Sequence, residues 1–236
     1  MNRKSESGQA LVEYALLFVF LGLLTISTLT LTGVDVQVSM CQAVKAFNAG
    51  YDCGHYFSDD FSDLSAWQIV KGKWQTLGGS LLGGPNEGQI FHPVSQNDYT
   101  INLADVTLKQ GNGYGVFFRA SKTNPVSGYS FQYDPGYGGG AFIMRKWVNG
   151  SELPPFAVAK ASGNKWNEPN RQVKVEVKGN TFAAYVDGHK VVEGSDSTYK
   201  SGSVGLRTWD STSMSVGKLS VDPTKSRGKQ GEKEDD

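Results

Sequence analysis

The chain has 236 residues, which leaves room for one domain of ordinary size plus an appended segment, or for two small domains. Its 23 basic and 23 acidic residues give a formal net charge of zero, so the composition excludes a strongly basic nucleic-acid-binding protein. Glycine is abundant, at 29 residues, and 11% of the residues are aromatic. This composition predicts many short strands joined by tight turns rather than a helical protein.

An apolar segment follows a short polar leader at the N-terminus. Residues 1–8 are polar and contain Arg3 and Lys4, whereas residues 9–33 contain one charged side chain, Glu13. A helix of this length, at about 1.5 Å per residue, spans the hydrocarbon core of a bilayer, which predicts a transmembrane helix. The basic leader places its N-terminus in the cytoplasm. A secretory signal peptide is the alternative, although the run is longer than a usual signal core and no clear A-x-A cleavage site follows it.

Residues 34–55 form a connector that contains both cysteines of the chain, Cys41 and Cys53. In an oxidising compartment they would form one disulfide, which would stabilise the fold by roughly 3 kcal/mol in the chain-entropy model. A zinc site is a weaker alternative, because His55 adds only a third ligand to the two cysteines. Two free thiols are the remaining alternative.

The stretch "SGQALVEYALL" resembles the N-terminal region of the Flp, or tight-adherence, branch of type IV pilins. In that family a prepilin peptidase cuts after a glycine on the cytoplasmic side, and the mature chain carries glutamate at its fifth position followed by tyrosine. Cleavage between Gly8 and Gln9 would make Glu13 the fifth residue and Tyr14 the sixth. The new α-amine of a neighbouring subunit would then pair with Glu13 and favour one register of the packed helices. The alternative is that Glu13 lies at the headgroup boundary without a special role.

The segment 56–222 alternates short strand-like runs with turn residues. In "VKVEVKGNTFAAYVDGHKVVE", turn residues at 178–180 and 187–188 separate three alternating runs, which predicts two consecutive hairpins. Strands at this spacing predict a mainly β fold, in which a two-sheet antiparallel β-sandwich follows the N-terminal helix. Residues 223–236 mix charges without apolar periodicity, and we expect a disordered tail there.

The stretch "HYFSDDFSDLSAWQIVKGKWQTLGGSLLGG" resembles the opening of concanavalin A-like jelly-roll domains. It has an acidic and aromatic start, two tryptophans and a glycine-rich turn that leads into a strand. "GYGVFFRASK", "GYSFQYDP" and "KSGSVGLRTWDSTSMSVGKLSVDP" resemble the middle and last strands of the same superfamily, including its laminin-G-like and glucanase-like branches. The resemblance covers residues 56–222 and implies a jelly-roll sandwich.

Alternation along four of these runs places polar and aromatic side chains on one face, opposite the apolar residues expected in the core. The members of this face are Arg119, Gln132, Arg145, Trp147, Arg207 and Trp209. If the runs lie in one sheet, aromatic rings beside planar hydrogen-bond donors suit the apolar face and the hydroxyl rim of a sugar. The predicted ligand is therefore a glycan. The alternative is that the arginines and tryptophans only stack on one another at a solvated surface.

Little in the sequence indicates catalysis or a cofactor. Retaining glycanases need two carboxylates about 5.5 Å apart, whereas the comparable strand, "RQVKVEVKGN", carries Glu176 alone. We therefore expect no enzyme activity, with a glycan hydrolase as the alternative, and no cofactor apart from one candidate structural calcium. Its ligands would be Asp59, Asp60 and Asp222, which approach one another if the first and last strands pair. Solvated turn acids are the alternative interpretation of these residues.

Together these features predict a pilin or pilin-like surface subunit. Its N-terminal helix would drive assembly, and its β-sandwich head would serve carbohydrate or surface adhesion. The expected partners are a prepilin peptidase, the inner membrane, other pilin subunits and a glycan, and the expected location is the cell membrane, in a single pass, followed by an extracellular pilus. One alternative is a purely structural filament subunit whose head packs on neighbouring heads, and another is a membrane-tethered glycan hydrolase.

Overall fold

The computed structural model describes residues 55–224, which belong to one of two compact units of the chain, Gly54–Asp236. The predicted leader, transmembrane helix and disulfide, and the part of the predicted C-terminal tail after residue 224, lie outside the described residues. The expectations for these parts therefore stay predictions, and they concern Gly8, Gln9, Glu13, Tyr14, Cys41 and Cys53. Within residues 55–224 the chain forms strands, turns and loops, and none of this part is a helix that could cross a membrane.

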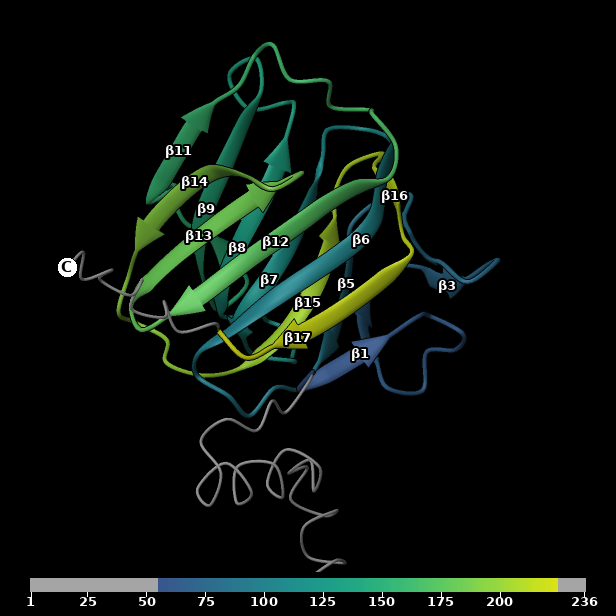
Figure 1. The fold of residues 1–236 in the computed structure, drawn as a ribbon, viewed down its shortest axis with the longest axis horizontal. Helices are drawn as coiled ribbons and strands as arrows, with labels where there is room; N and C mark the ends of the chain where they lie inside the picture. Colours follow the sequence, from purple (N-terminus) through teal and green to yellow (C-terminus); the bar gives the residue numbers. More distant parts are fainter. Residues whose placement is uncertain (1–54, 225–236) are drawn as a thin grey trace, which may run out of the picture. The chain divides into compact units, whose positions relative to one another are not determined.

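The described residues form two sheets that pack face to face as a sandwich (Figure 1). The first sheet has nine strands. Its main path runs through β14 (His189–Ser195), β13 (Thr181–Val186), β12 (Arg171–Lys178), β6 (Tyr99–Gln110), β16 (Ser213–Val216), β4 (Leu81–Gly83) and β3 (Trp74–Thr76). Off this path, β17 (Lys218–Asp222) pairs with β6, and β1 (Phe57–Asp59) pairs with β17.

The second sheet has eight strands and carries the site described below. Its path runs through β10 (Ser151–Glu152), β9 (Ala141–Val148), β8 (Gly128–Asp134), β7 (Tyr114–Ala120), β15 (Ser203–Thr208), β5 (Gly88–His92) and β2 (Gln68–Lys71). A further strand, β11 (Ala157–Lys160), pairs with β9. The pairings in both sheets are antiparallel, so the prediction of a mainly β, two-sheet antiparallel sandwich is confirmed.

Alternating apolar residues build the core between the two sheets. On β12 the inward-facing residues Val173, Val175 and Val177 are at most 1% exposed. From the opposite sheet, Val116 and Phe118 of β7 are fully buried in the same core. Full burial of such a side chain contributes roughly 1.5–3 kcal/mol. Because a one-residue slip of β12 would move its three valines to the solvent face, the alternation fixes which face of this strand points outward.

The two predicted hairpins are confirmed. Strands β12 and β13 pair across a turn that contains Gly179, with φ of 56°, and β13 and β14 pair across Asp187 and Gly188. The φ values of Asp187 and Gly188 are 49° and 80°, so both central residues of the second turn have the positive φ of a type I′ turn. Asp-Gly is a favoured dipeptide for that geometry, which is why the sequence signal was reliable here.

The eight-stranded sheet also carries a small apolar cluster on the face that points away from the core. This outer cluster contains Phe91, Phe117, Ala120, Val126 and Trp147, each at most 4% exposed. Val126 lies in the loop between β7 and β8, so this loop covers part of the outward face. Strands β7 and β15 are buried on both faces, so the floor of the site consists of buried strands.

Candidate functional site

The strand order of the eight-stranded sheet brings most of the predicted face together. Gly115 of β7 pairs with Gln132 on one side and with Arg207 on the other, so these two side chains flank a position without a side chain. A Cβ atom at Gly115 would lie 3.3 Å from the Cβ atom of Arg207 and 3.7 Å from the ring of Trp209. Five of the six predicted residues lie near one another on this outward face: Gln132, Arg145, Trp147, Arg207 and Trp209.

Arg119 is the exception, and its assignment to this face was wrong. The backbone of Arg119 has φ of 46°, and the register between β7 and β15 shifts next to it. This irregularity turns Arg119 inward, where its guanidinium lies 5.4 Å from the ring of the core residue Phe182 and donates to the carbonyl oxygens of Asn97 and Tyr199. Ala120, which alternation places in the core, instead joins the outer cluster.

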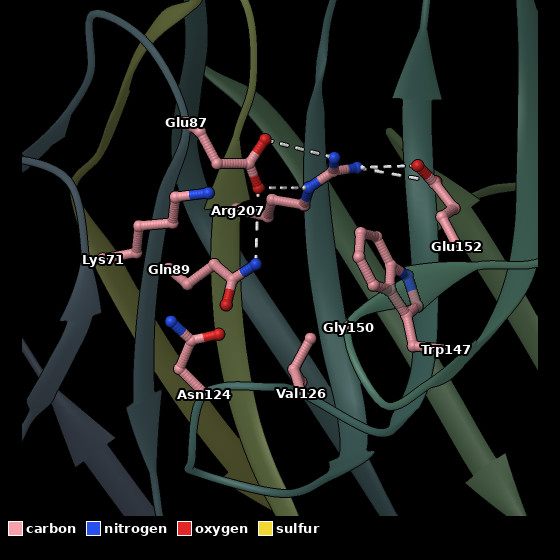
Figure 2. A pocket seen from close by; sticks show the side chains of 9 residues that line it. All are labelled: Lys71, Glu87, Gln89, Asn124, Val126, Trp147, Gly150, Glu152 and Arg207. Atoms are coloured by element: carbon pink, nitrogen blue, oxygen red, sulfur yellow. Dashed lines mark hydrogen bonds and ion pairs between the residues drawn. The ribbon is translucent and has the colours of Figure 1, made fainter.

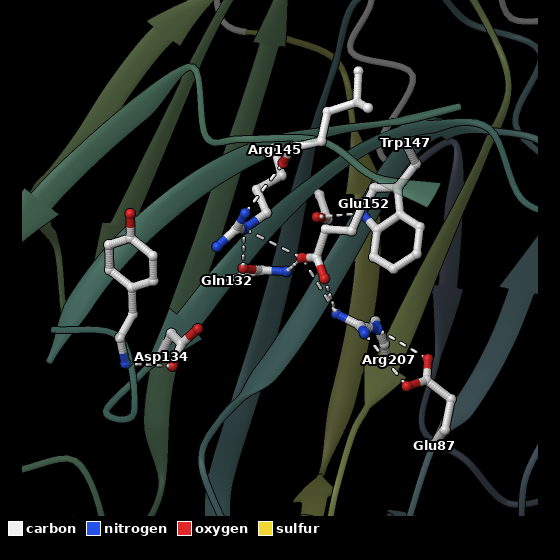
Figure 3. Close-up of polar contacts among 10 residues, drawn as sticks. Glu87, Gln132, Asp134, Arg145, Trp147, Glu152 and Arg207 are labelled. Atoms are coloured by element: carbon white, nitrogen blue, oxygen red, sulfur yellow. Dashed lines mark hydrogen bonds and ion pairs between the residues drawn. The ribbon is translucent and has the colours of Figure 1, made fainter. Parts of the chain in front are cut away.

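Arg207 is the centre of the site, because its guanidinium is paired at both ends (Figure 3). Its Nε donates to Glu87 Oε1 at 3.0 Å and its Nη2 to Glu87 Oε2 at 3.3 Å, which is a two-pronged arginine–carboxylate pair. Its Nη1 lies 3.4 Å from Glu152 Oε2. The side chain of Arg207 is 9% exposed, so the two carboxylates compensate a charge that is almost fully removed from water.

Two indole rings fix the plane of this guanidinium. The carbon Cζ of Arg207 lies 4.5 Å from the ring centre of Trp147 and 4.9 Å from that of Trp209, both within cation–π range. Trp147 is 4% exposed, and its Nε1 donates to Ser130 Oγ at 3.0 Å. Its ring also packs edge-on against Phe117. Trp147 is therefore a buried support for Arg207 rather than an open platform for a sugar ring.

Gln132 and Arg145 extend the network along β8 and β9. Arg145 Nε donates to Gln132 Oε1 at 3.0 Å and lies 3.2 Å from Glu152 Oε1, while Gln132 Nε2 donates to the same glutamate. Arg145 Nη1 donates to the carbonyl oxygen of Leu153 at 3.1 Å. Glu152 thus accepts hydrogen bonds from Gln132 and Arg207 and forms a further ion pair with Arg145, so three side chains hold its carboxylate in place.

A pocket of about 270 Å³ opens beside Arg207 (Figure 2). We call it the Arg207 pocket. Its walls carry two carboxylates, two cations and two amides around a small apolar patch, so it is a polar pocket. The lining residues are Lys71, Glu87, Gln89, Asn124, Val126, Trp147, Gly150, Glu152 and Arg207.

Two turns position the carboxylates of this pocket. Asn149 and Gly150 have φ of 48° and 77°, so they form a tight turn between β9 and β10 that pairs Glu152 with Trp147. Gly150 N donates to the carbonyl oxygen of Val126 at 2.7 Å, which holds this turn against the loop between β7 and β8. On the other side, the stretch before Glu87 is held by Thr208, whose hydroxyl donates to the carbonyl oxygen of Asn86 at 2.7 Å.

Glu87 and Glu152 were not among the predicted site residues. The Asn-Gly pair at 149–150 is a hairpin signal in the sequence, and it would have placed Glu152 opposite Trp147. For Glu87 the only signal is its position two residues before Gln89 at a glycine-rich turn, which does not specify where its side chain points.

Glu176, the one carboxylate considered for a glycanase strand, lies on the other sheet. It lines a wider groove of about 860 Å³ on the solvent face of the nine-stranded sheet, together with Lys174 and Tyr185. Partial burial opposes its ionisation, but hydrogen bonds from Lys174 and Tyr185 lower the pKa of Glu176 below its usual value. It has no part in the Arg207 pocket.

The predicted calcium ligands do not converge. Strands β1 and β17 pair as expected, but Asp59 lies opposite Leu219, three positions from Asp222, so the two carboxylates point to opposite faces about 10 Å apart along the strand. Asp59 instead accepts hydrogen bonds from Phe61 N and Trp67 Nε1. Asp60 accepts one from Ser62 N, and Asp222 accepts from Asn102 and Ser220. Between residues 55 and 224 no group of three or more histidine, cysteine or acidic side chains is arranged to hold a metal ion.

The sandwich is similar to domains of known proteins whose names refer to carbohydrates. The chain is similar to a levanase of Bacillus subtilis (strain 168), with 28% identity over 159 residues that cover 65% of this chain and 22% of the levanase. The chain therefore spans less than a quarter of the length of that relative.

Solved structures agree with this likeness. The carbohydrate binding module CBM66 from Bacillus subtilis matches with a TM-score of 0.55 and 26% identity, covering 65% of this chain and 94% of the module. The VIP36 exoplasmic/lumenal domain, with a TM-score of 0.56 and 10% identity, covers 72% of this chain and 90% of its own and shares the fold alone. Residues 57–218 match a family model over more than half of the chain, so the chain belongs to the 3-keto-alpha-glucoside-1,2-lyase-like domain family.

Proposed function

We propose that the β-sandwich head is a carbohydrate-binding module that holds one end of a glycan in the Arg207 pocket. The observation that carries this proposal is the fixed position of Arg207 between two carboxylates and two indoles at the edge of a small polar pocket. Hydroxyl groups of a sugar both donate and accept hydrogen bonds, and such a preorganised set of carboxylates, amides and cations matches them without further ordering.

The size of the pocket favours a chain end over a chain interior. Its volume of about 270 Å³ is near the lower end of ligand pockets, which start at about 300 Å³. The loop that contains Val126 and the turn at Gly150 close one side of it. A terminal sugar residue fits this geometry better than a polysaccharide that runs across the sheet. The identities of the relatives, a carbohydrate binding module and a levanase, support the same proposal.

The pairing of both carboxylates favours binding rather than hydrolysis. A glycosidase needs one carboxyl group that donates a proton and a second that stays ionised. Glu87 and Glu152 both pair with Arg207, so the two glutamates share one partner instead of lying in the two contrasting environments that distinguish a catalytic acid from a base. A membrane-tethered glycan hydrolase remains the alternative that the relatives' names raise, and product analysis in the experiment below tests it.

We further propose that this head is carried by a pilin-like N-terminal helix. The support is the sequence alone: Gly8, Glu13 and Tyr14 stand at the offsets of a tight-adherence prepilin at the start of an apolar run. In this proposal a prepilin peptidase releases a chain that begins at Gln9, and the subunit moves from the inner membrane to a surface filament. A purely structural filament subunit, whose head packs only on neighbouring heads, is the alternative.

Two measurements test these proposals separately. A fragment that begins at Gly54, the first residue of the compact unit, is titrated against a panel of oligosaccharides and polysaccharides, with chromatography of each mixture for new products. Glycan binding that is abolished by Arg207→Ala would support the carbohydrate-binding module. New reducing ends in the mixtures would instead support the glycan hydrolase. N-terminal sequencing of the full-length protein from membranes and sheared filaments should give Gln9, whereas a start at Met1 or after Gly33 would exclude the pilin proposal.

A further inference from the structure

Lys71 differs from the other charged residues of the Arg207 pocket. Glu87 and Glu152 each pair with Arg207, whereas within the described part of the chain Lys71 forms no ion pair. Figure 2 shows its side chain on the same wall as Glu87 and Gln89. Flexible lysines are common on protein surfaces, so a role for Lys71 requires that the backbone direct its side chain towards the pocket.

A bulge in the edge strand β2 directs Lys71 towards the pocket. The register between β2 and β5 shifts between Ile69 and Lys71, and Lys71 then lies opposite Gln89, a pocket residue. The extra residue, Val70, packs on the outer cluster. Without the bulge, alternation would place Val70 and Lys71 on opposite faces, whereas here both turn to the side of the site.

The residue after Lys71 holds this arrangement against Glu87. Gly72 has φ of 75°, and a Cβ atom there would lie 2.4 Å from the carbonyl oxygen of Glu87 and 2.6 Å from the Cα atom of Gly88. The turn that follows β2 therefore packs directly on the backbone of Glu87, at a distance that only glycine allows. Two backbone features, the bulge and this contact, thus place the Lys71 side chain beside the pocket.

The charged groups of the pocket are paired with one another except for one, which a ligand of the opposite charge would pair with. The carboxylate of Glu87 accepts hydrogen bonds from Arg207 and Gln89. The carboxylate of Glu152 accepts from Arg207 and Gln132 and forms an ion pair with Arg145, so the acceptors of the pocket are largely used inside the protein. Arg207 pairs with both glutamates, so Lys71 is the one charged residue of the pocket lining that has no ion-pair partner among the described residues. A ligand that brings an anionic acceptor would pair with this charge.

We propose that the Arg207 pocket prefers a sugar residue that carries one carboxylate, a uronic acid, and that Lys71 binds this group. The inference rests on the proposed carbohydrate-binding function and specifies its ligand class. Lys71 is a specificity residue in this proposal, because Arg207 and the glutamates hold the hydroxyl groups that neutral and acidic sugars share.

The test compares sugars that differ only at C6. The fragment that begins at Gly54 is titrated by calorimetry with the methyl glycosides of glucose, galactose and mannose and with the matching methyl uronides, at low and at high salt. We expect at least one uronide to bind about tenfold more tightly than its neutral partner, and the preference to shrink at high salt because part of the ion pair is exposed to solvent. Lys71→Gln should reduce the preference to about twofold or less, because the uronide loses more affinity than the neutral sugar when the positive charge is removed.

Lys73→Gln is the matched control, because Lys73 lies two residues along the same turn but does not line the pocket. It should keep the full preference. A neutral sugar that binds as tightly as its uronide, or a preference that survives Lys71→Gln, would overturn the inference and leave the carbohydrate-binding function intact. Absence of binding by all six sugars and by the whole glycan panel would overturn both.

Discussion

The guanidinium of Arg207 lies between the indole rings of Trp147 and Trp209, with its carbon Cζ 4.5 Å and 4.9 Å from the two ring centres. Glu87 and Glu152 pair with its nitrogen atoms. The side chain is thereby fixed before any ligand arrives, and the entropy of ordering an arginine does not oppose binding. A fixed fork of donors next to a small pocket is the feature from which the functional proposal and several predictions follow.

Arg207→Lys should separate the charge of this residue from its shape. Lysine keeps the positive charge but cannot contact both oxygens of Glu87 and reach Glu152 at once. We expect glycan affinity to fall by about tenfold or more, with a loss of roughly 1–3 kcal/mol in the free energy of unfolding because one carboxylate loses its partner. Calorimetric titration and urea denaturation measure the two effects.

Arg119→Ala is the control for the loss of a buried arginine as such. Arg119 is 2% exposed and donates to the carbonyl oxygens of Asn97 and Tyr199, away from the pocket. Its removal should lower the free energy of unfolding by roughly 2–3 kcal/mol and leave glycan affinity unchanged at a temperature where the variant is folded. If Arg119→Ala weakened binding as much as Arg207→Lys, the site would not be centred on Arg207.

The two tryptophans should respond differently to truncation. Trp147→Ala opens a cavity in the outer cluster and leaves Ser130 without its donor, so we expect a loss of roughly 3–5 kcal/mol in the free energy of unfolding. Trp209 is only half-buried, and its replacement by alanine should lower the free energy by about 1 kcal/mol. Both variants should weaken glycan binding, because each releases one side of Arg207. A Trp147→Ala variant with wild-type stability and no binding would instead make Trp147 a direct sugar contact.

The alternation of polar and apolar residues predicted which residues share the outward face of the site better than it predicted what each of them does there. Gln132, Arg145, Trp147 and Arg207 were placed on one face because period-two patterns hold wherever strands are regular and one side is buried. The prediction for Arg119 was wrong because a bulge shifts the alternation by one residue. An arginine at the centre of a bulge gives no signal in the sequence that the bulge is there.

Other features depend on contacts between distant segments. Glu87 and Arg207 are 120 residues apart in the chain, and their pairing follows from the order β7-β15-β5, which local patterns do not encode. The same holds for the outer cluster. Alternation places Trp147 on the outward face, where it could serve as a platform for a ligand. The loop that contains Val126 packs with Trp147 in the outer cluster, and this contact between distant segments makes the tryptophan a buried residue instead.

Gly72→Ala should test whether the turn after β2 positions the pocket. A methyl group there meets the carbonyl oxygen of Glu87, so the turn or Glu87 has to move. Glycan binding should weaken by about threefold or more, and the free energy of unfolding should fall by roughly 1–3 kcal/mol from strain.

The matched control for Gly72→Ala is Gly78→Ala. Gly78 has φ of 61°, but a Cβ atom there meets no other atom within 4 Å. It therefore adds the backbone strain of an alanine with positive φ without the collision, and binding should stay unchanged. Equal effects of the two substitutions on affinity would show that the close contact with Glu87 has no role in the site.

Asp196 should make the head sensitive to acid. Its carboxylate accepts hydrogen bonds from Lys146 Nζ at 2.8 Å and from Tyr129 Oη at 2.6 Å, and so joins the segment after β14 to strands β8 and β9. Partial burial opposes ionisation, but these bonds, together with those from Thr198, hold the pKa of Asp196 well below its usual value. Burial and the bond to Asp196 also raise the pKa of Tyr129 to about 12, so the tyrosine keeps its proton throughout the range tested.

Because the pKa of Asp196 is lower in the folded than in the unfolded chain, its contribution is fully present above the unfolded value of about 4 and is lost as the pH falls towards the folded value. Asp196→Asn should therefore be less stable than the wild type at pH 7, and the difference should shrink steadily between about pH 4 and pH 2. Urea denaturation across this range measures it, with the exposed Asp60→Asn as the control that should show little difference at any pH. A difference between wild type and Asp196→Asn that stays constant down to pH 2 would mean that the ionised carboxylate does not hold the two sheets together.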